Sequence, residues 1–129
     1  MKKVLIVNAN YYKDVSTRLV FSSKNLLKKN NIKHNIINVP GIFEIPFILR
    51  KFIKKFDGFV VLGCVIKGET PHFDLISKST FDAIIKISVD FNKPITNGII
   101  TCLNMKQAIQ RSLITKKSKK VNKGREAAS

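Results

Sequence analysis

The stretch Gly63–Asp74, which reads G-C-V-I-K-G-E-T-P-H-F-D, organises the fold that the sequence predicts. It follows the short apolar run Phe59–Leu62, so we interpret Gly63 and Gly68 as marking the point where a buried strand opens into a loop. Thr70 and Pro71 then suit the cap and first turn of a helix. Apolar residues recur beyond them at helical spacing: Phe73, Ile76, Phe81, Ile84, Ile85 and Val89. The unit is therefore a strand, a glycine loop and a helix.

This glycine loop predicts a site for a small oxyanion. The backbone N–H groups of Gly68, Glu69 and Thr70 would point out of the helix N-terminus, where partial positive charge favours phosphate. The spacing also approaches that of a triphosphate-binding loop, but Glu69 stands where such loops need a lysine, which argues against a nucleotide triphosphatase. His72 is expected one turn into the helix beside the anion, either as a proton-transferring group or as a structural residue.

Length and composition indicate one domain, residues 1–129, with a substantial core. Hydrophobic residues make up 44% of the chain, yet no apolar run approaches the roughly 18 residues of a membrane span. No targeting segment is expected before the first strand at Lys3. Cys64 and Cys102 each lie near the end of an apolar run, where buried free thiols are common. We expect a cytoplasmic protein.

A formal net charge of +16 raises the possibility of nucleic-acid binding. Only four of the 24 basic residues are arginine, however, and the lysines are spread over the whole chain. Recognition of bases and phosphates usually relies on the planar fork of arginine. We therefore expect neither nucleic acid nor a membrane as the main partner.

The N-terminal half alternates strands and helices. Lys3–Asn8 is a continuous apolar run, as expected of a central strand, and Ser16 is a candidate cap for a helix that ends at Asn30 and Asn31. His34–Val39 is a second strand, and a helical run follows it as far as Phe56.

The C-terminal half continues this alternation. Pro94–Leu103 contains a fourth strand, and Asn104 is a candidate cap for a short helix that carries Arg111. This order predicts an α/β fold of three layers, flavodoxin-like, with a mostly parallel four-stranded sheet between helices. Ligands of such sheets bind at the carboxyl ends of the strands. The residues expected there are Tyr11, Glu44, Gly68 to His72, and Asn97 onward.

Two features of this edge of the sheet have both a structural and a functional interpretation. Tyr11 and Tyr12 follow the first strand, where they either stack on a heterocycle or simply cover the loop. Glu44 either complements a helix dipole or accepts hydrogen bonds from a polyol.

Four blocks carry a resemblance to one family: V-P-G-I-F-E-I-P at 39–46, the 63–74 stretch, N-G-I-I-T at 97–101 and N-K-G at 122–124. In order and separation they resemble those of the lumazine synthases, over nearly the whole chain. The resemblance implies condensation of 5-amino-6-ribitylaminouracil with 3,4-dihydroxy-2-butanone 4-phosphate. The products would be 6,7-dimethyl-8-ribityllumazine, phosphate and water, formed without a cofactor or a metal.

The resemblance also implies roles for particular residues. Tyr11 would stack on the pyrimidine, Phe43 and Glu44 would hold the ribityl chain, and His72 would transfer a proton. Arg111 would bind phosphate from the neighbouring subunit. The remaining substrate-binding positions implied are Val65 and Ile66 beside the pyrimidine, Gly68, Glu69 and Thr70 in the phosphate loop, and Asn97 and Lys123 in the last two blocks.

Departures from the family pattern concern three places. Ile42 stands where a small residue is usual, Tyr12 where asparagine is common, and the link from Arg111 to Lys123 is longer than usual.

The family assembles as pentamers; because Lys3 already begins the first strand, we expect discrete or paired pentamers instead of sixty-subunit shells. Two alternatives remain: a non-catalytic relative that binds RNA or flavin precursors, and a cysteine hydrolase built on Cys64, His72 and Asp74.

Overall fold

A computed structural model describes residues 2–68 and 72–113 of the chain. The elements alternate along this sequence as follows: β1 (Lys3–Ala9), α1 (Lys13–Lys29), β2 (Lys33–Val39), the short 3₁₀ helix η1 (Ile42–Glu44), α2 (Ile45–Phe52), β3 (Gly58–Ile66), α3 (Phe73–Phe91), β4 (Ile95–Cys102) and α4 (Met105–Ser112).

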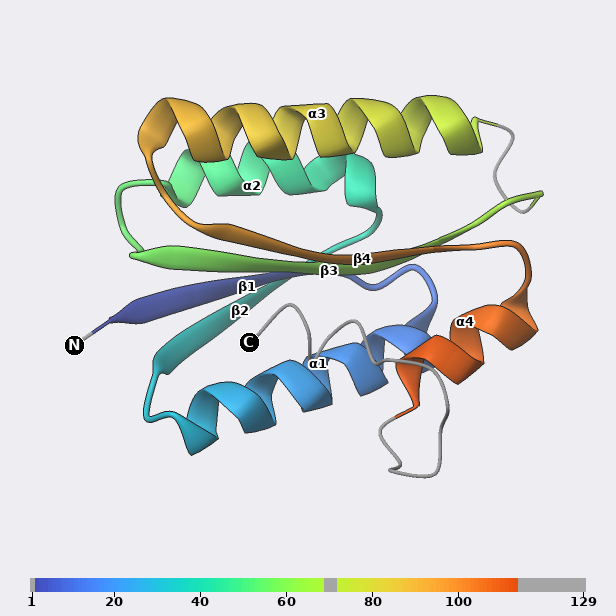
Figure 1. Ribbon diagram of the computed structural model, residues 1–129, viewed down its shortest axis with the longest axis horizontal. Helices are drawn as coiled ribbons and strands as arrows, with labels where there is room; N and C mark the ends of the chain where they lie inside the picture. Colours follow the sequence, from blue (N-terminus) through green and yellow to red (C-terminus); the bar gives the residue numbers. More distant parts are fainter. Residues whose placement is uncertain (1, 69–71, 114–129) are drawn as a thin grey trace.

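The four strands form one sheet in the order β2-β1-β3-β4, and every pair in it is parallel (Figure 1). The predicted α/β class is confirmed, with a sheet that is wholly parallel. Parallel neighbours need a crossover connection, which α1, α2 and α3 supply. The strand order is that of the flavodoxin-like arrangement, whose order reverses between β1 and β3.

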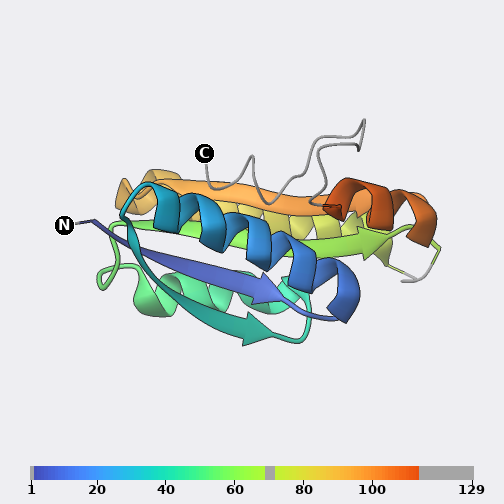
Figure 2. The ribbon, with the colours of Figure 1, turned by 90° about the horizontal axis from the view of Figure 1, so that it is seen from below.

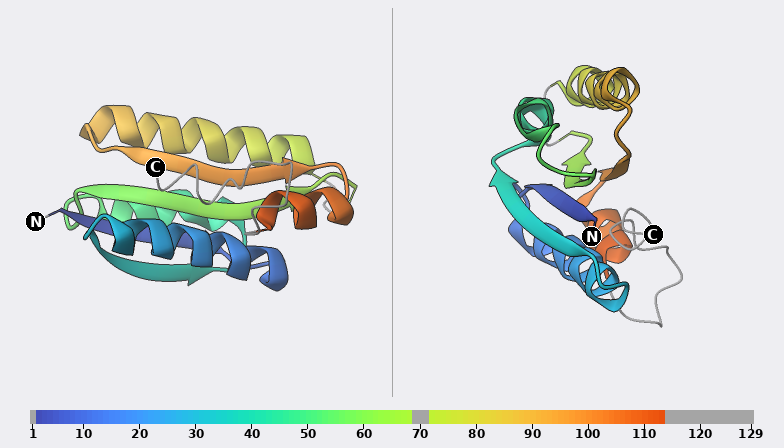
Figure 3. Two further views of the ribbon diagram at one scale, coloured as in Figure 1. Left: turned by 60° about the horizontal axis from the view of Figure 1, so that its bottom comes forward. Right: turned by 90° about the vertical axis from the view of Figure 1, so that its left-hand side faces the viewer.

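Helices cover both faces of the sheet, which gives three layers. Helices α2 and α3 lie on one face and α1 and α4 on the other, as the end-on view in Figure 3 shows. Figure 2 shows α1 lying over the sheet and running back along the strands in the direction opposite to β1. Each face has its own apolar cluster: one includes Leu49 of α2 and Ile84 of α3, the other Leu19 of α1 and Ala108 of α4. Within the described ranges, none of the helices is long and apolar enough to cross a membrane.

Strand β3 lies at the centre of the molecule, and all nine of its residues are buried. Its side chains alternate between the two clusters: Val61 and Val65 belong to the α2/α3 side, Leu62 and Ile66 to the α1/α4 side. The prediction that the strand opens into a loop is wrong for Gly63, because the strand continues to Ile66, whereas Gly68 lies in a turn beyond its end. Gly63 lies inside the strand because Ile42 and Ala9 leave no room for a side chain at this position.

Helix α1 begins earlier than predicted. Tyr12 is its N-cap, and Ser16, the expected cap, is a buried residue of the second turn. The Ser16 hydroxyl donates to Asn8 Oδ1 at 3.2 Å and accepts from Asn8 Nδ2 at 2.9 Å, and Asn8 Nδ2 also donates to Asn38 Oδ1 at 3.0 Å. Ser16 therefore joins α1 to β1 instead of capping the helix, and Asn8 joins β1 to β2.

The remaining boundaries agree more closely. Asn104 caps α4 as predicted, with its Oδ1 accepting from the Gln107 backbone N–H at 2.9 Å. Helix α1 ends at Lys29, one residue before the expected end at Asn30. Helix α2 stops at Phe52 and does not reach Phe56.

Candidate functional site

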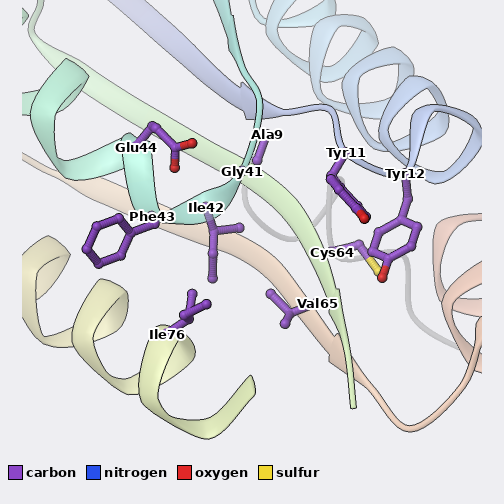
Figure 4. Close-up of a pocket in the computed structure, with 10 residues that line it drawn as sticks. All are labelled: Ala9, Tyr11, Tyr12, Gly41, Ile42, Phe43, Glu44, Cys64, Val65 and Ile76. Carbon is purple, nitrogen blue, oxygen red and sulfur yellow. The ribbon is translucent and has the colours of Figure 1, made fainter. Parts of the chain in front are cut away.

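An apolar cavity opens where the strand order reverses, at the carboxyl ends of β1 and β3. Open parallel sheets bind their ligands at this crevice. The cavity has a volume of about 330 Å³, which falls within the range of small-molecule sites. Figure 4 shows side chains from β1, β3, η1, α3 and the loop before α1 around it.

One wall is aromatic. Tyr11 and Tyr12 meet edge to face, with ring centroids 4.9 Å apart. Tyr12 packs against the α1/α4 cluster, whereas Tyr11 is 71% exposed. Tyr12 holds the ring of Tyr11 beside the cavity, and an exposed aromatic face in this position can stack on a flat heterocycle.

The opposite wall comes from Gly41 and η1. Phe43 and Glu44 both line the cavity and are both exposed (Figure 4). The chain turns from β2 into η1 because Pro40 and Gly41 do not continue the strand. Pro46 then suits the first turn of α2. A carboxylate beside an apolar ring can accept hydrogen bonds from hydroxyl groups while the ring covers a carbon chain.

The floor is apolar and tightly packed. Ala9, Ile42, Val65 and Ile76 line it, from β1, η1, β3 and α3. A Cβ added at Gly63 would lie 2.9 Å from Ile42 Cγ2 and 3.1 Å from the Ala9 Cβ. Only glycine lets η1 and β1 approach β3 so closely, which is a reason for this glycine that the sequence pattern did not reveal.

We predict that Gly63→Ala lowers the free energy of unfolding by about 1–3 kcal/mol, because the added methyl overpacks this floor. Urea unfolding of the purified variant measures the loss. Gly41→Ala is the matched control, since its Cβ would meet nothing closer than 3.7 Å. In a double-mutant cycle, Ile42→Ala should relieve part of the cost of Gly63→Ala; additive losses would show that the two residues do not oppose each other.

Val65 and Ile66, which were predicted to lie side by side at the ligand, point to opposite faces. Val65 lines the cavity, whereas Ile66 is buried in the α1/α4 cluster. Adjacent residues of a strand always diverge in this way. Ile66 can therefore contact a ligand in this cavity only through its backbone.

The start of α3 also differs from the prediction. The helix begins at Phe73 and His72 is its N-cap, exposed, instead of lying one turn inside. Gly68 adopts φ of +89°, the left-handed conformation that glycine tolerates, with open space around it. Glu69, Thr70 and the predicted cap at Thr70 and Pro71 lie outside the described residues.

Two other predicted site residues, Arg111 and Asn97, do not line this cavity. Arg111 lies on α4, where its Nη1 donates to the Thr101 backbone carbonyl at 2.9 Å. Asn97 is the third residue of β4, far from its carboxyl end, and its Oδ1 accepts from the Ile99 N–H at 2.9 Å. Lys123 lies outside the described residues.

The structure also adds residues that the sequence did not assign to the site: Ala9, Gly41 and Ile76. Ile76 had been predicted only as part of the apolar face of its helix. A periodic apolar pattern identifies the buried face of a helix. It does not tell which residues of that face cover the sheet and which lie beyond the sheet's edge at a cavity.

Cys64 also lines the cavity, but it lacks the environment of a catalytic nucleophile. Its hydrogen bond to Cys102 and its burial raise the pKa of the Cys64 thiol, so the group stays protonated at neutral pH. A cysteine hydrolase needs the thiolate. The pKa of the Cys102 thiol is lowered instead, to about 7. The main cause is the hydrogen bond from Cys64; Arg111 lowers the pKa further, whereas burial raises it. No group of three or more metal-ligating side chains occurs among residues 2–68 and 72–113.

Fold and cavity together define an open, doubly wound α/β protein with a small-molecule site at its strand-order reversal. The sequence profile of the 6,7-dimethyl-8-ribityllumazine synthases matches residues 1–129. The chain belongs to the 6,7-dimethyl-8-ribityllumazine synthase family.

Individual relatives agree with this assignment. A 6,7-dimethyl-8-ribityllumazine synthase of Campylobacter jejuni (strain RM1221) is 39% identical over 130 residues, which cover 97% of this chain and 82% of the relative. Proteins of the same name from Bartonella bacilliformis and Limosilactobacillus reuteri are 38% and 39% identical, covering 90% and 83% of this chain and 79% and 72% of their own lengths.

Proposed function

We propose that this protein is a lumazine synthase, a transferase that acts in riboflavin biosynthesis. It condenses 5-amino-6-(D-ribitylamino)uracil with 3,4-dihydroxy-2-butanone 4-phosphate to give 6,7-dimethyl-8-ribityllumazine, phosphate and water. The observation that carries the proposal is the cavity between Tyr11 and η1 in a chain of this family. It offers a stacking ring, an apolar floor and a carboxylate, which suit a pyrimidine that carries a polyol.

The pyrimidine lies against Tyr11, with Val65 and the backbone of Ile66 on its other side. Phe43 and Glu44 hold the ribityl chain, because the ring covers its carbon atoms and the carboxylate accepts hydrogen bonds from its hydroxyl groups. Glu44 lies close to Gly41, 3.7 Å from where a Cβ would stand, so a side chain at 41 would compete with a hydroxyl for the carboxylate.

Gly68, Glu69 and Thr70, which precede α3 in the sequence, bind the phosphate substrate, with His72 as the proton-transferring group. The left-handed Gly68 and the exposed His72 support this assignment, since the loop must turn sharply to present N–H groups to an anion. Arg111, Asn97 and Lys123 complete the set of substrate-binding residues. Much of the rate enhancement comes from aligning the two reactants.

The decisive experiment mixes the purified protein with both substrates and follows lumazine formation by absorbance. Product formation that also persists in Cys64→Ser supports the synthase. No product in the presence of tight pyrimidine binding would instead identify a non-catalytic relative. Activity that is lost only in Cys64→Ser would point to thiol chemistry.

We predict that Tyr11→Ala weakens binding of a ribityl-pyrimidine inhibitor by about 1–3 kcal/mol, the range of aromatic stacking on a base. Isothermal titration measures the change. Tyr11→Phe is the matched control, because it keeps the ring and removes only the hydroxyl. Equal affinity of wild type and Tyr11→Ala would mean that Tyr11 merely covers the loop.

The protein assembles as a homopentamer whose sites lie at subunit interfaces. Within one subunit Arg111 is on α4 and does not line the cavity, which supports an arrangement in which a second subunit supplies the arginine that holds phosphate. Large apolar side chains that one subunit leaves exposed also support assembly: Phe47 of α2, and Leu75, Ile85 and Val89 of α3.

We predict a particle of five times 14.6 kDa, or of twice that if pentamers pair, by light scattering at physiological salt. Mixed assemblies test the shared site: Arg111→Ala and His72→Ala subunits, each impaired alone, should regain activity when dissociated and reassembled together. A mixture no more active than its components would place Arg111 and His72 in the same subunit's site, and an active monomer would exclude the shared site altogether.

We also propose that the chain is a single domain that works in the cytoplasm without a cofactor. Both of its cysteines are free thiols, as expected in a reducing compartment.

A further inference from the structure

The two cysteines lie on adjacent strands and face the same side of the sheet. In the β3–β4 register Cys64 is opposite Ile100 and Ile66 is opposite Cys102. Because side chains alternate along a strand, Cys64 and Cys102 both face the layer of α1 and α4. Both belong to the apolar cluster on that side. The two thiols are thus diagonal neighbours in an apolar environment.

The diagonal arrangement suits a bridging ion better than a disulfide bond. Two residues along a strand, combined with one strand spacing, separate the Cα atoms by about 8 Å. Disulfides span Cα separations of about 4.4–6.8 Å, so the backbone would have to move to form one. The side chains nevertheless lean together, since the two thiols hydrogen-bond to each other.

A positive charge lies beside this pair. Arg111 hydrogen-bonds to the Cys102 side chain and also donates to the Thr101 carbonyl, which fixes its guanidinium next to the sulfur. A guanidinium stays protonated at any physiological pH. The pair can therefore carry net negative charge at a lower cost than two thiolates in an apolar cluster alone.

The pair also has an entry route. Cys64 is 8% exposed and lines the candidate active-site cavity, and Figure 4 shows it beside the ring of Tyr12. Cys102 is more deeply buried behind it. A small ion that enters the cavity would meet Cys64 first and Cys102 next.

We propose that Cys64 and Cys102 form a two-coordinate site for a soft monovalent cation, of which Cu⁺ is the biological example. Binding replaces the two thiol protons: Cu⁺ and two thiols give a bis-thiolate with one negative charge, and two protons pass to solvent without any change of oxidation state. Two metal–sulfur bonds of about 2.3 Å, the length of a zinc–thiolate bond, would place the sulfurs about 4.6 Å apart, a longer span than the S–S bond of a disulfide. Arg111 balances the charge of the complex.

The number and type of ligands select against other metals. Thiolates are soft ligands, which favour Cu⁺ over Mg²⁺ or Ca²⁺. Zinc is held by four ligands in structural sites and by three protein ligands in catalytic sites. The described part of the chain does not assemble three such side chains anywhere.

Titration of the reduced, oxygen-free protein with Cu⁺, against a coloured Cu⁺ chelator, tests the site. Wild type should take up one Cu⁺ per chain. Cys64→Ser and Cys102→Ser should each bind at least about ten-fold more weakly, since even the loss of a residue that only supports a metal ligand costs about 10- to 100-fold. Met105→Leu, which removes the other sulfur of the described region, is the matched control and should bind as wild type does.

Two measurements on the wild type keep the test decisive if the cysteine variants fold poorly. X-ray absorption of the loaded protein should show two sulfur neighbours around copper. Cu⁺ should also quench the intrinsic fluorescence, because the chain has no tryptophan and its two tyrosines lie next to Cys64. Stoichiometric uptake that persists in either serine variant, a copper ion without two sulfur neighbours, or no uptake at all would overturn the proposal.

Discussion

Replacing His72 with alanine is expected to lower kcat by about 10²–10⁴ and leave a measurable residual rate. A positioned proton donor or acceptor contributes about that much, while alignment of the two substrates contributes independently. His72 is exposed at the N-cap of α3, immediately after the segment that holds the left-handed Gly68, so its ring is free to meet a bound phosphate substrate. Steady-state kinetics with both substrates measure the effect.

The chain supplies a matched control for this variant. His34 is its other histidine, half-buried on β2 with ring Nδ1 3.4 Å from the Ile32 carbonyl. His34→Ala should keep kcat near the wild-type value. A His72→Ala enzyme as fast as the His34→Ala enzyme near neutral pH would remove His72 from the reaction.

Replacing Phe59 with alanine is expected to lower the free energy of unfolding by about 3–5 kcal/mol, because it empties a large volume at the centre of the molecule. Phe59 is 2% exposed on β3, and its ring lies 6.0 Å from that of Phe56. A domain of this size has about 5–15 kcal/mol of stability in total. The variant should therefore unfold at much lower urea, a shift that circular dichroism can follow.

Phe21→Ala is the control for Phe59→Ala, since it removes the same side chain from a position on α1 that is 53% exposed. It should change the unfolding midpoint little in a subunit studied below its assembly concentration. Equal losses for the two variants would mean that β3 is not the centre of the core.

The sequence predicted the order of elements and the fold class because apolar periodicity records which face of each element is covered. It predicted boundaries less well where one residue type serves two purposes. Gly63 is an example. Glycine is common in loops, but Gly63 lies inside β3, where Ile42 and Ala9 are too close to the strand backbone for any side chain. Ser16 is another, since a hydroxyl that can cap a helix can equally bond across to a neighbouring strand.

The candidate site was predictable to the extent that it follows the carboxyl ends of strands. Tyr11, Phe43, Glu44 and Val65, which the sequence predicts to bind substrate, all line one cavity. Ile66 was placed beside Val65 by its position in a motif, although a strand turns adjacent side chains to opposite faces. The roles of all these residues stay predictions until the kinetic and binding experiments are done.

The division of the core by the sheet has a consequence for how the protein can diverge. Substitutions above the sheet reach those below it only through the backbone of the strands, and distant core sites contribute to stability almost additively. A substitution on the cavity side, at Ile42 for example, can therefore be tolerated without a compensating change around Leu19 and Ala108 on the other side of the sheet. Each layer is free to accumulate mutations at its own pace, and β3, which belongs to both, should be the slowest segment of the chain to change.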